Sequence, residues 1–265
     1  EMNCCADENY TTTGAGTKSG NVSPLQLRSS TIAEQLKLST NGKAKVYSVA
    51  MNDAPAVFSS GFSGDAAFWF DQVSGRMITS SFYMKQLPDW AVKFNQKELA
   101  KEYSSRNWAL LKSFPDYRES LPDNNSYEAG YGQGLNTFPH KMGELVKKAG
   151  DYSPLITTPF ANSILKSFAI ELMDHEPIGT DDFPDLITLF FSSMDVEQES
   201  FGPASVEMED LYLRMDQDIA EIINYAEKKY GRENVLFFLT SNTPASYPVN
   251  SLKGRLRVPA GRFSS

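Results

Sequence analysis

An aspartate at the end of an apolar run is the first candidate for chemistry in this sequence. The run "PDLITLFFSSMD" ends on Asp195, and Glu197 and Glu199 follow in the next loop. In α/β proteins, a carboxylate at the carboxyl end of a strand commonly meets a metal or a substrate. This loop carries Glu197 and Glu199 where a zinc site of that shape would use a histidine. The alternative interpretations are a structural aspartate at a strand end and solvated loop charges.

Histidine and cysteine, the other common metal ligands, are scarce. The histidines are His140 and His175, so a histidine-rich zinc site cannot be built from this chain alone. Cys4 and Cys5 are adjacent, a spacing that fits neither a zinc finger nor a thioredoxin motif. We expect one or both to pair outside this chain or to lie half buried, which is a weak sign of an oxidising compartment. In "TFPH", His140 is interpreted as a hydrogen-bonded structural residue.

The charge of the chain restricts its partners. The net charge is −8 and the pI is about 4.9, so the surface should repel the phosphates of nucleic acids and of anionic membranes. No apolar run approaches the roughly 20 residues that a membrane-spanning helix needs. We therefore expect no nucleic acid partner and no membrane span.

The candidate strands place Asp195 at the edge of a parallel sheet. Residues 44–51, 184–195 and 233–242 are short apolar runs, typical of buried strands. The amphipathic stretch 205–229 predicts a helix between the last two, so residues 184–242 form a strand–helix–strand unit with a right-handed parallel crossover. The stretches "AAFWFD" and "RMITSSFYM" predict two more strands around the turn "QVSG".

Helices and one long connection fill the rest of the chain. Helices are predicted after Ser30 or Thr31, from about Pro88, and over the stretch "TPFANSILKSFAIELMDHE". Residues 113–140 show no periodicity, and we interpret them as an ordered loop or lid, with carbohydrate contact as an alternative role. The aromatic residues expected to anchor this loop are Phe114, Tyr117, Tyr127, Tyr131 and Phe138.

Stretches spread over nearly the whole chain match one family in the same order. They include "STIAEQLKLSTNGKAKVYSVAMND", "DAAFWFDQVSGRMITSSFYMKQLPDWAVKFN", "PDLITLFFSSMD" and "FGPASVEMEDLYLRMDQDIA". They resemble the alkaline phosphatase superfamily in its type I phosphodiesterase/nucleotide pyrophosphatase branch, and most of all the periplasmic alkaline phosphatases of Bacteroidetes. The resemblance covers the middle portion of such proteins. It leaves the nucleophile, one aspartate ligand and a last histidine ligand outside this chain.

The resemblance implies an α/β fold, with an alkaline-phosphatase-like core whose mainly parallel sheet is flanked by helices, and with an inserted cap. We expect residues 1–87 and 166–265 to build the core and residues 88–165 to form the cap.

The resemblance also implies a ligand set for two zinc ions. Asp195 matches a family ligand, but Glu199 stands where the family has a histidine. Asn242 and Thr243 stand in place of an aspartate–histidine pair; the amide carries no charge, and threonine is a poor zinc ligand. We expect no zinc and no other cofactor. The remaining oxygens of Asp195, Glu199 and Asn242 form, as an alternative, a cluster for a hard cation such as Ca²⁺ or Mg²⁺.

The phosphate-holding cations implied by the resemblance are missing as well. The family's lysine and arginine fall on Asn52 and Ala54, and a further histidine falls on Phe62. Removing one cation from such a clamp already lowers the rate by orders of magnitude.

These positions together predict a degenerate active site with no catalytic residue in this chain. We expect a non-catalytic binding or scaffold protein, although the enzymatic status stays open. The alternative is a metal-dependent phosphate-ester hydrolase with a rearranged site, completed by segments outside this chain. The expected partner is an unidentified protein or a phosphate-containing ligand, and the expected location is the periplasm or the cell exterior.

Overall fold

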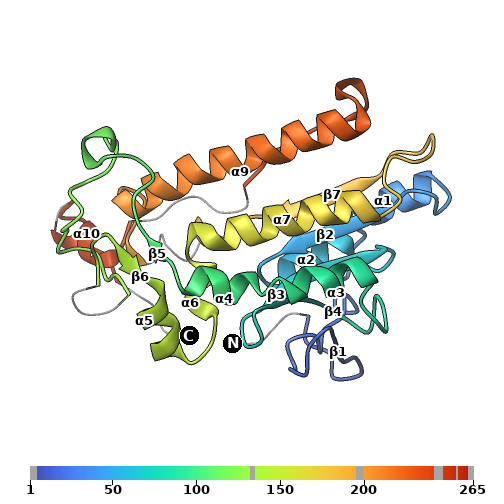
Figure 1. The fold of residues 1–265 in the computed structure, drawn as a ribbon, viewed down its shortest axis with the longest axis horizontal. Helices are drawn as coiled ribbons and strands as arrows, with labels where there is room; N and C mark the ends of the chain where they lie inside the picture. Colours follow the sequence, from blue (N-terminus) through green and yellow to red (C-terminus); the bar gives the residue numbers. More distant parts are fainter. Residues whose placement is uncertain (1–4, 132–134, 195–199, 242–246, 255, 262–265) are drawn as a thin grey trace.

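A five-stranded sheet forms the centre of the molecule (Figure 1). The computed structural model describes residues 5–131, 135–194, 200–241, 247–254 and 256–261. The strand order is β1-β4-β3-β2-β7, in which β2 runs parallel to both β3 and β7, while β4 is antiparallel to β3 and to β1. The strands are β1 (Thr12–Thr13), β2 (Val46–Ala50), β3 (Ala66–Asp71), β4 (Arg76–Ser80) and β7 (Leu186–Phe190).

Helices cover both faces of this sheet. Helix α2 (Asp53–Ser60) connects β2 to β3 and covers one face, whereas α7 (Pro159–His175) and α3 (Asp89–Gln96) cover the other. The long helix α9 (Val206–Tyr230) packs along α7 as an outer layer (Figure 1). The prediction of an α/β core with parallel central strands and flanking helices is therefore confirmed.

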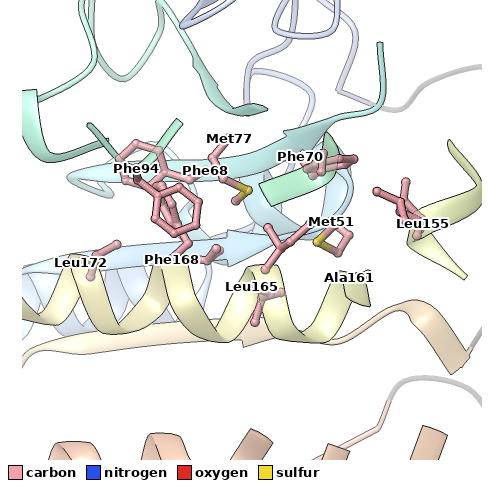
Figure 2. Packing of buried hydrophobic residues seen from close by; sticks show 14 of the residues in the cluster. Met51, Phe68, Phe70, Met77, Phe94, Leu155, Ala161, Leu165, Phe168 and Leu172 are labelled. Atoms are coloured by element: carbon pink, nitrogen blue, oxygen red, sulfur yellow. The ribbon is translucent and has the colours of Figure 1, made fainter. Parts of the chain in front are cut away.

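Side chains alternate along β2 and β3 between two apolar cores, as the period of a strand requires. On the α7 side, Val49 of β2 and Phe68 of β3 join the larger core. Phe168 of α7 makes edge-on ring contacts there, at 5.1 Å from Phe68 and 5.0 Å from Phe94 between ring centroids (Figure 2). On the α2 side, Trp69 lies in the smaller core. The two-sided burial explains why these strands read as continuous apolar runs.

Smaller elements complete the chain. Helix α1 (Ile32–Ser39) begins with a capping box between Thr31 and Glu34, which confirms the predicted helix start. The predicted helix after Pro88 is interrupted, because Glu98 adopts a left-handed φ of 49° between α3 and the next helix. The remaining elements are α4 (Leu99–Ser104), β5 (Asn107–Trp108), η1 (Phe114–Asp116), β6 (His140–Lys141), α5 (Met142–Ala149), α6 (Ser153–Ile156), η2 (Arg232–Asn234) and α10 (Val249–Gly254).

The predicted loop anchors differ in burial. Tyr117 is 8% exposed and Phe138 packs against the main core, whereas Phe114 is 46% exposed and does not anchor the loop. Residues from 88–165, among them Trp90 and Trp108, share that core with the sheet. The division into a core and a cap at residues 88 and 165 stays a prediction.

The predicted strand over residues 233–242 is wrong for the part that the structure describes. Residues 232–234 form η2, and residues 235–241 belong to no strand. Leu236, Phe238 and Leu239 are 75%, 83% and 85% exposed. The physical reason is that an apolar run becomes a strand only when a neighbouring strand pairs with its backbone, and no described strand does so here. The paired strand β7 is also only half-buried rather than covered on both faces.

Candidate functional site at the carboxyl edge of the sheet

The parallel strands β3, β2 and β7 end level with one another. The register pairs Ala50 of β2 both with Trp69 of β3 and with Phe190 of β7. Asn52 and Ser192 each follow two residues later, so both lie beyond the strand ends at the carboxyl edge. This is the edge at which α/β proteins bind ligands.

Asn52 begins α2 at this edge. It is the N-cap residue in an extended conformation, with φ −126° and ψ 158°, and its side chain makes no capping hydrogen bond. The backbone N–H of Ala54 donates to Oδ1 of Asp53 at 2.8 Å. Residues 51–56, "MNDAPA", contain no lysine, arginine or histidine. The turn therefore offers a neutral amide and one carboxylate, but no cation.

Phe62 does not belong to this edge. It follows the last turn of α2 and is 41% exposed, and its backbone N–H donates to Oε1 of Glu34 at 2.8 Å. A few residues later, the N–H of Asp65 donates to the carbonyl of Val46, the first residue of β2. The structure therefore brings Asn52 and Ala54 together and leaves Phe62 at the opposite end of α2.

The residues after β7 form a buried polar group. Ser193 Oγ donates to Oδ1 of Asn162 at 2.9 Å, and both residues are 0% exposed. Ser192 Oγ and Asn162 Nδ2 are buried and have no hydrogen-bond partner in the described structure. A buried polar atom without a partner costs about 1–3 kcal/mol. Among the described residues, these two atoms therefore find no complementary group.

The predicted ligand positions Asp195, Glu199, Asn242 and Thr243 lie outside the described residues. Across the ranges that the structure describes, no group of three or more His, Cys, Asp or Glu side chains is arranged to hold a metal ion.

At the third strand end, Asp71 is fully engaged in structural contacts. It is 0% exposed, and it accepts hydrogen bonds from the hydroxyls of Thr17, Ser19 and Ser74 and from the backbone N–H of Val73. Burial alone would raise the pKa of Asp71, but these hydrogen bonds hold it below its ordinary value. Asp71 closes the β3–β4 hairpin and leaves no lone pair for a ligand.

A second polar cluster lies under the start of α9, and sequence reasoning missed it. Nε2 of His140 lies 2.9 Å from Oε1 of Glu207, and the two residues are 3% and 0% exposed. The prediction of a hydrogen-bonded structural histidine is therefore confirmed. The rings around His140, with centroids 4.7–5.5 Å away, are Trp108, Tyr131, Phe138 and Phe201.

Burial decides the protonation of this pair. It raises the pKa of Glu207 to about 8, with the carboxylates of Asp123 and Asp210 adding to the effect, although the backbone N–H of Glu207 opposes it. Burial also lowers the pKa of His140 to about 4 against the opposing pull of Asp123 and Asp210. Both pKa shifts favour a neutral Glu207 carboxyl beside a neutral imidazole.

Glu128 extends the cluster from the 113–140 loop. Burial and the nearby Glu207 carboxylate raise the pKa of Glu128 to about 8. One oxygen of each glutamate, Glu128 Oε2 and Glu207 Oε2, has no hydrogen-bond partner within the described residues. The cluster therefore contains two buried acids whose pKa values are raised by burial.

The spacing of the acids on α9 could have revealed this cluster. Glu207, Leu211, Asp218 and Ile222 recur at intervals of four and seven residues and are all buried. Acids on the apolar stripe of a helix indicate a buried polar network. The acids in the first turn, Glu207 and Glu209, also complement the positive end of the helix.

Parallel central strands with helices on both faces define an α/β protein, a class whose members commonly bind ligands at the strand ends. The family model for type I phosphodiesterase/nucleotide pyrophosphatase matches residues 26–243. The chain belongs to this family, and the resemblance stated from its sequence is confirmed.

Two characterised relatives match nearly the whole chain. The alkaline phosphatase PafA of Elizabethkingia meningoseptica is 36% identical over 263 residues, which are 98% of this chain and 48% of that protein. The alkaline phosphatase PhoV of Synechococcus elongatus is 33% identical over 264 residues, 99% of this chain and 47% of that protein. The chain therefore spans about half the length of these relatives.

A solved structure shows the same fold. The crystal structure of wild-type PafA superimposes with a TM-score of 0.92 at 33% identity, covering 99% of this chain and 50% of that one. The α/β fold of an alkaline phosphatase is therefore present over the whole length of this chain.

Proposed function

We propose that this chain is a non-catalytic member of its family, which acts by binding a phosphate-containing ligand or a protein. The observation that carries the proposal is the turn after β2, where Asn52 and Ala54 stand at the positions that the family resemblance gives to a lysine and an arginine. Phosphoryl transfer concentrates negative charge on the transferred group, and cations at that place supply most of the stabilisation. A turn without a cation can hold a ligand without accelerating its cleavage.

The residues at the other ligand positions implied by the resemblance support the same proposal. Glu199, Asn242 and Thr243 replace two histidines and an aspartate in the ligand set that the resemblance implies. A carboxylate at position 199 also adds negative charge where a phosphate would approach. We expect no zinc in the protein, and the all-oxygen set of Asp195, Glu199 and Asn242 would favour Ca²⁺ or Mg²⁺ over zinc if a cation binds.

Hydrolysis assays test the absence of catalysis. The purified chain, supplied with zinc, is assayed on aryl phosphate monoesters and diesters while its metal content is measured by elemental analysis. We expect no turnover above a buffer blank and no stoichiometric zinc. Zinc-dependent turnover that disappears in Asp195→Ala would contradict the proposal and favour a hydrolase with a rearranged site.

A second measurement tests ligand binding at the carboxyl edge. Inorganic phosphate is titrated into the chain and into the double variant Asn52→Lys with Ala54→Arg, and the heat is measured. We expect the added cations to tighten binding at least tenfold, because both lie at the edge where phosphate would bind. The control variant, Leu38→Lys with Ser39→Arg, adds the same charges on the exposed end of α1. Equal binding by both variants would show that the edge is not a phosphate site.

Location and partners belong to the proposal as well. No helix in the described ranges is long and apolar enough to cross a membrane. Because the relatives are alkaline phosphatases, we propose a periplasmic or secreted location, and the acidic net charge of −8 argues against a nucleic acid partner. Cell fractionation with an antibody against the chain tests the location, and recovery in the cytoplasm would contradict it.

A further inference from the structure

Residues 118–131 form a strap that lies against the start of α9 (Figure 1). These residues belong to no helix and no strand. Backbone hydrogen bonds tie the strap to the turn before α9. The N–H of Leu121 donates to the carbonyl of Ala204 at 2.7 Å, and the N–H of Ala129 donates to that of Ser200 at 2.8 Å. A segment held in this way, without regular structure of its own, can open locally while the sheet stays folded.

Two acids meet beneath the strap, one from each side of this contact. Glu128 comes from the strap and Glu207 from α9, and within the described residues Oε2 of each has no hydrogen-bond partner. Glu207 is 0% exposed. Burial, and after it the Glu207 carboxylate, raises the pKa of Glu128. The two groups therefore sense each other across the contact, and burial disfavours charge on both.

Further acids border the pair. Asp123 of the strap and Asp210 of α9 add to the effect of burial on the pKa of Glu207. Burial also raises the pKa of Asp123, although the N–H of Phe138 and the nearby His140 oppose it. At the outer side of the contact, Oε2 of Glu209 accepts the N–H of Ser120 at 2.9 Å. Every one of these carboxylates makes a second negative charge beneath the strap less favourable.

The groups that could compensate this charge are neutral or already engaged. His140 contacts Glu207, but burial lowers the pKa of its imidazole to about 4, so it carries no charge near neutral pH. The guanidinium of Arg214 and the hydroxyl of Tyr117 are both bound to Asp210. Ionised Glu128 and Glu207 would therefore lack a counter-charge as long as the strap is closed.

We propose that the strap 118–131 is a proton-dependent closure, which lies on α9 while Glu128 and Glu207 are protonated and opens when both ionise at alkaline pH. Opening places the two carboxylates in water. It also uncovers Phe201, which is 2% exposed and shares a small cavity with Tyr127 and Glu128 of the strap. None of these residues lies at the carboxyl edge of the sheet, so the inference goes beyond the proposed function and does not depend on it.

The direction of the effect follows from proton linkage. In the open strap the two carboxyls take the ordinary value of 4.5, whereas in the closed strap both values are raised to about 8. The closed state therefore binds more protons, and its advantage is complete below pH 4.5 and is lost as the pH rises to about 8. Between these values, each group lowers the closing constant by up to about tenfold per pH unit.

Amide hydrogen exchange at pH 6 and pH 8 tests the inference. Each rate is divided by the intrinsic rate of that amide at the same pH, which gives the opening constant. We expect the opening constant of the Leu121 and Ala129 amides to rise at least tenfold between the two pH values. At pH 8 it should exceed that of the β2 amides at least a hundredfold, because the strap opens without unfolding the sheet.

Glutamine variants identify the groups responsible, since glutamine imitates a protonated carboxyl. Glu128→Gln should keep the opening constant at pH 6 within about threefold of the parent and reduce the rise to pH 8 at least fivefold. Adding Glu207→Gln should leave a rise of less than about threefold. Glu144→Gln, with a side chain that is 68% exposed, is the control and should show the full rise of the parent. If circular dichroism shows that the double variant is unfolded, the single variant at the half-buried Glu128 decides.

Three outcomes would overturn the inference. The first is an opening constant of the strap that stays constant between pH 6 and pH 8. The second is equal opening constants in the strap and in β2, which would mean that the strap opens only when the whole chain unfolds. The third is a Glu128→Gln variant that keeps the full rise of the parent or is already open at pH 6.

Discussion

The two ends of α9 reverse the usual distribution of polar and apolar side chains. At its first turns, Glu207 and Asp210 are both 0% exposed, whereas Leu236 and Phe238, just beyond its last turn, are 75% and 83% exposed. The acids are buried because other parts of the chain supply hydrogen-bond partners for them. The apolar residues are exposed because no described part of the chain covers them. Burial therefore follows from the neighbours that a residue finds and not from its type alone.

The buried end is held by several donors around one carboxylate. Asp210 accepts hydrogen bonds from Trp108 Nε1 at 2.7 Å, from the Leu111 N–H at 2.8 Å and from Arg214 Nε at 2.6 Å, and also from the hydroxyl of Tyr117. Three of these donors come from the segment around residues 108–117, which lies about a hundred positions earlier in the sequence. This carboxylate therefore fixes that segment to α9.

Among the substitutions that test this comparison, removal of the Asp210 carboxylate should have the largest effect on stability. Asp210→Ala should lower the free energy of unfolding by about 3–5 kcal/mol, because the buried donors and the Arg214 guanidinium lose their acceptor. Urea denaturation followed by tryptophan fluorescence measures the loss. Asp216→Ala, at an exposed position of the same helix, is the control and should stay within about 0.5 kcal/mol. Equal effects would show that the network adds no stability.

The next largest effect should be seen in how the free energy of unfolding changes with pH, because the buried acids near the start of α9 titrate differently in the folded and unfolded states. The pKa of Glu207 is raised from 4.5 to about 8, so the folded state holds a proton that the unfolded state releases. The stability from this group is complete below about pH 4.5 and is lost as the pH rises to about 8. Glu128 acts in the same direction. His140, whose pKa is lowered to about 4, acts only on the acid side, where stability falls as the pH drops below its ordinary value of 6.5.

Glu207→Gln isolates the contribution of Glu207 to that curve. The free energy of unfolding, measured by urea denaturation at several pH values, should fall less steeply between pH 5 and 8 in the variant than in the parent. Glu144→Gln, with a side chain that is 68% exposed, should leave the slope unchanged. A parent curve that is flat or rising over this range would contradict the assignment of a protonated Glu207.

The smallest effect on stability is expected in the exposed apolar run that follows α9 and η2. Leu236→Asp with Phe238→Asp should change the free energy of unfolding of the isolated chain by less than about 0.5 kcal/mol, because neither side chain is buried. Leu211→Ala, which truncates a leucine that is 0% exposed, should cost about 2–5 kcal/mol. Urea denaturation measures both. A large loss in the aspartate variant would mean that the run is covered within the chain itself.

Local patterns predicted much of the fold and part of the site. The β3–β4 hairpin, the capped start of α1 and the long helices α7 and α9 follow from turn chemistry, capping and periodicity, which act over a few residues. The parallel register of β2 and β7 brings Asn52 to the edge where the sequence placed it. Phe62, which the resemblance implies as a further family position, follows α2, whereas Asn52 precedes this helix.

The sequence by itself determined where strands and helices can form, because an apolar run and its period are local properties. Only the tertiary structure decided that residues 186–190 become a strand while residues 235–241 do not, since a strand exists only when a second backbone pairs with it. The same reason applies to Glu207. Its pKa is raised by burial, and His140, the residue that contacts it, comes from 67 positions away in the sequence. Burial, pairing and protonation are set by neighbours in space.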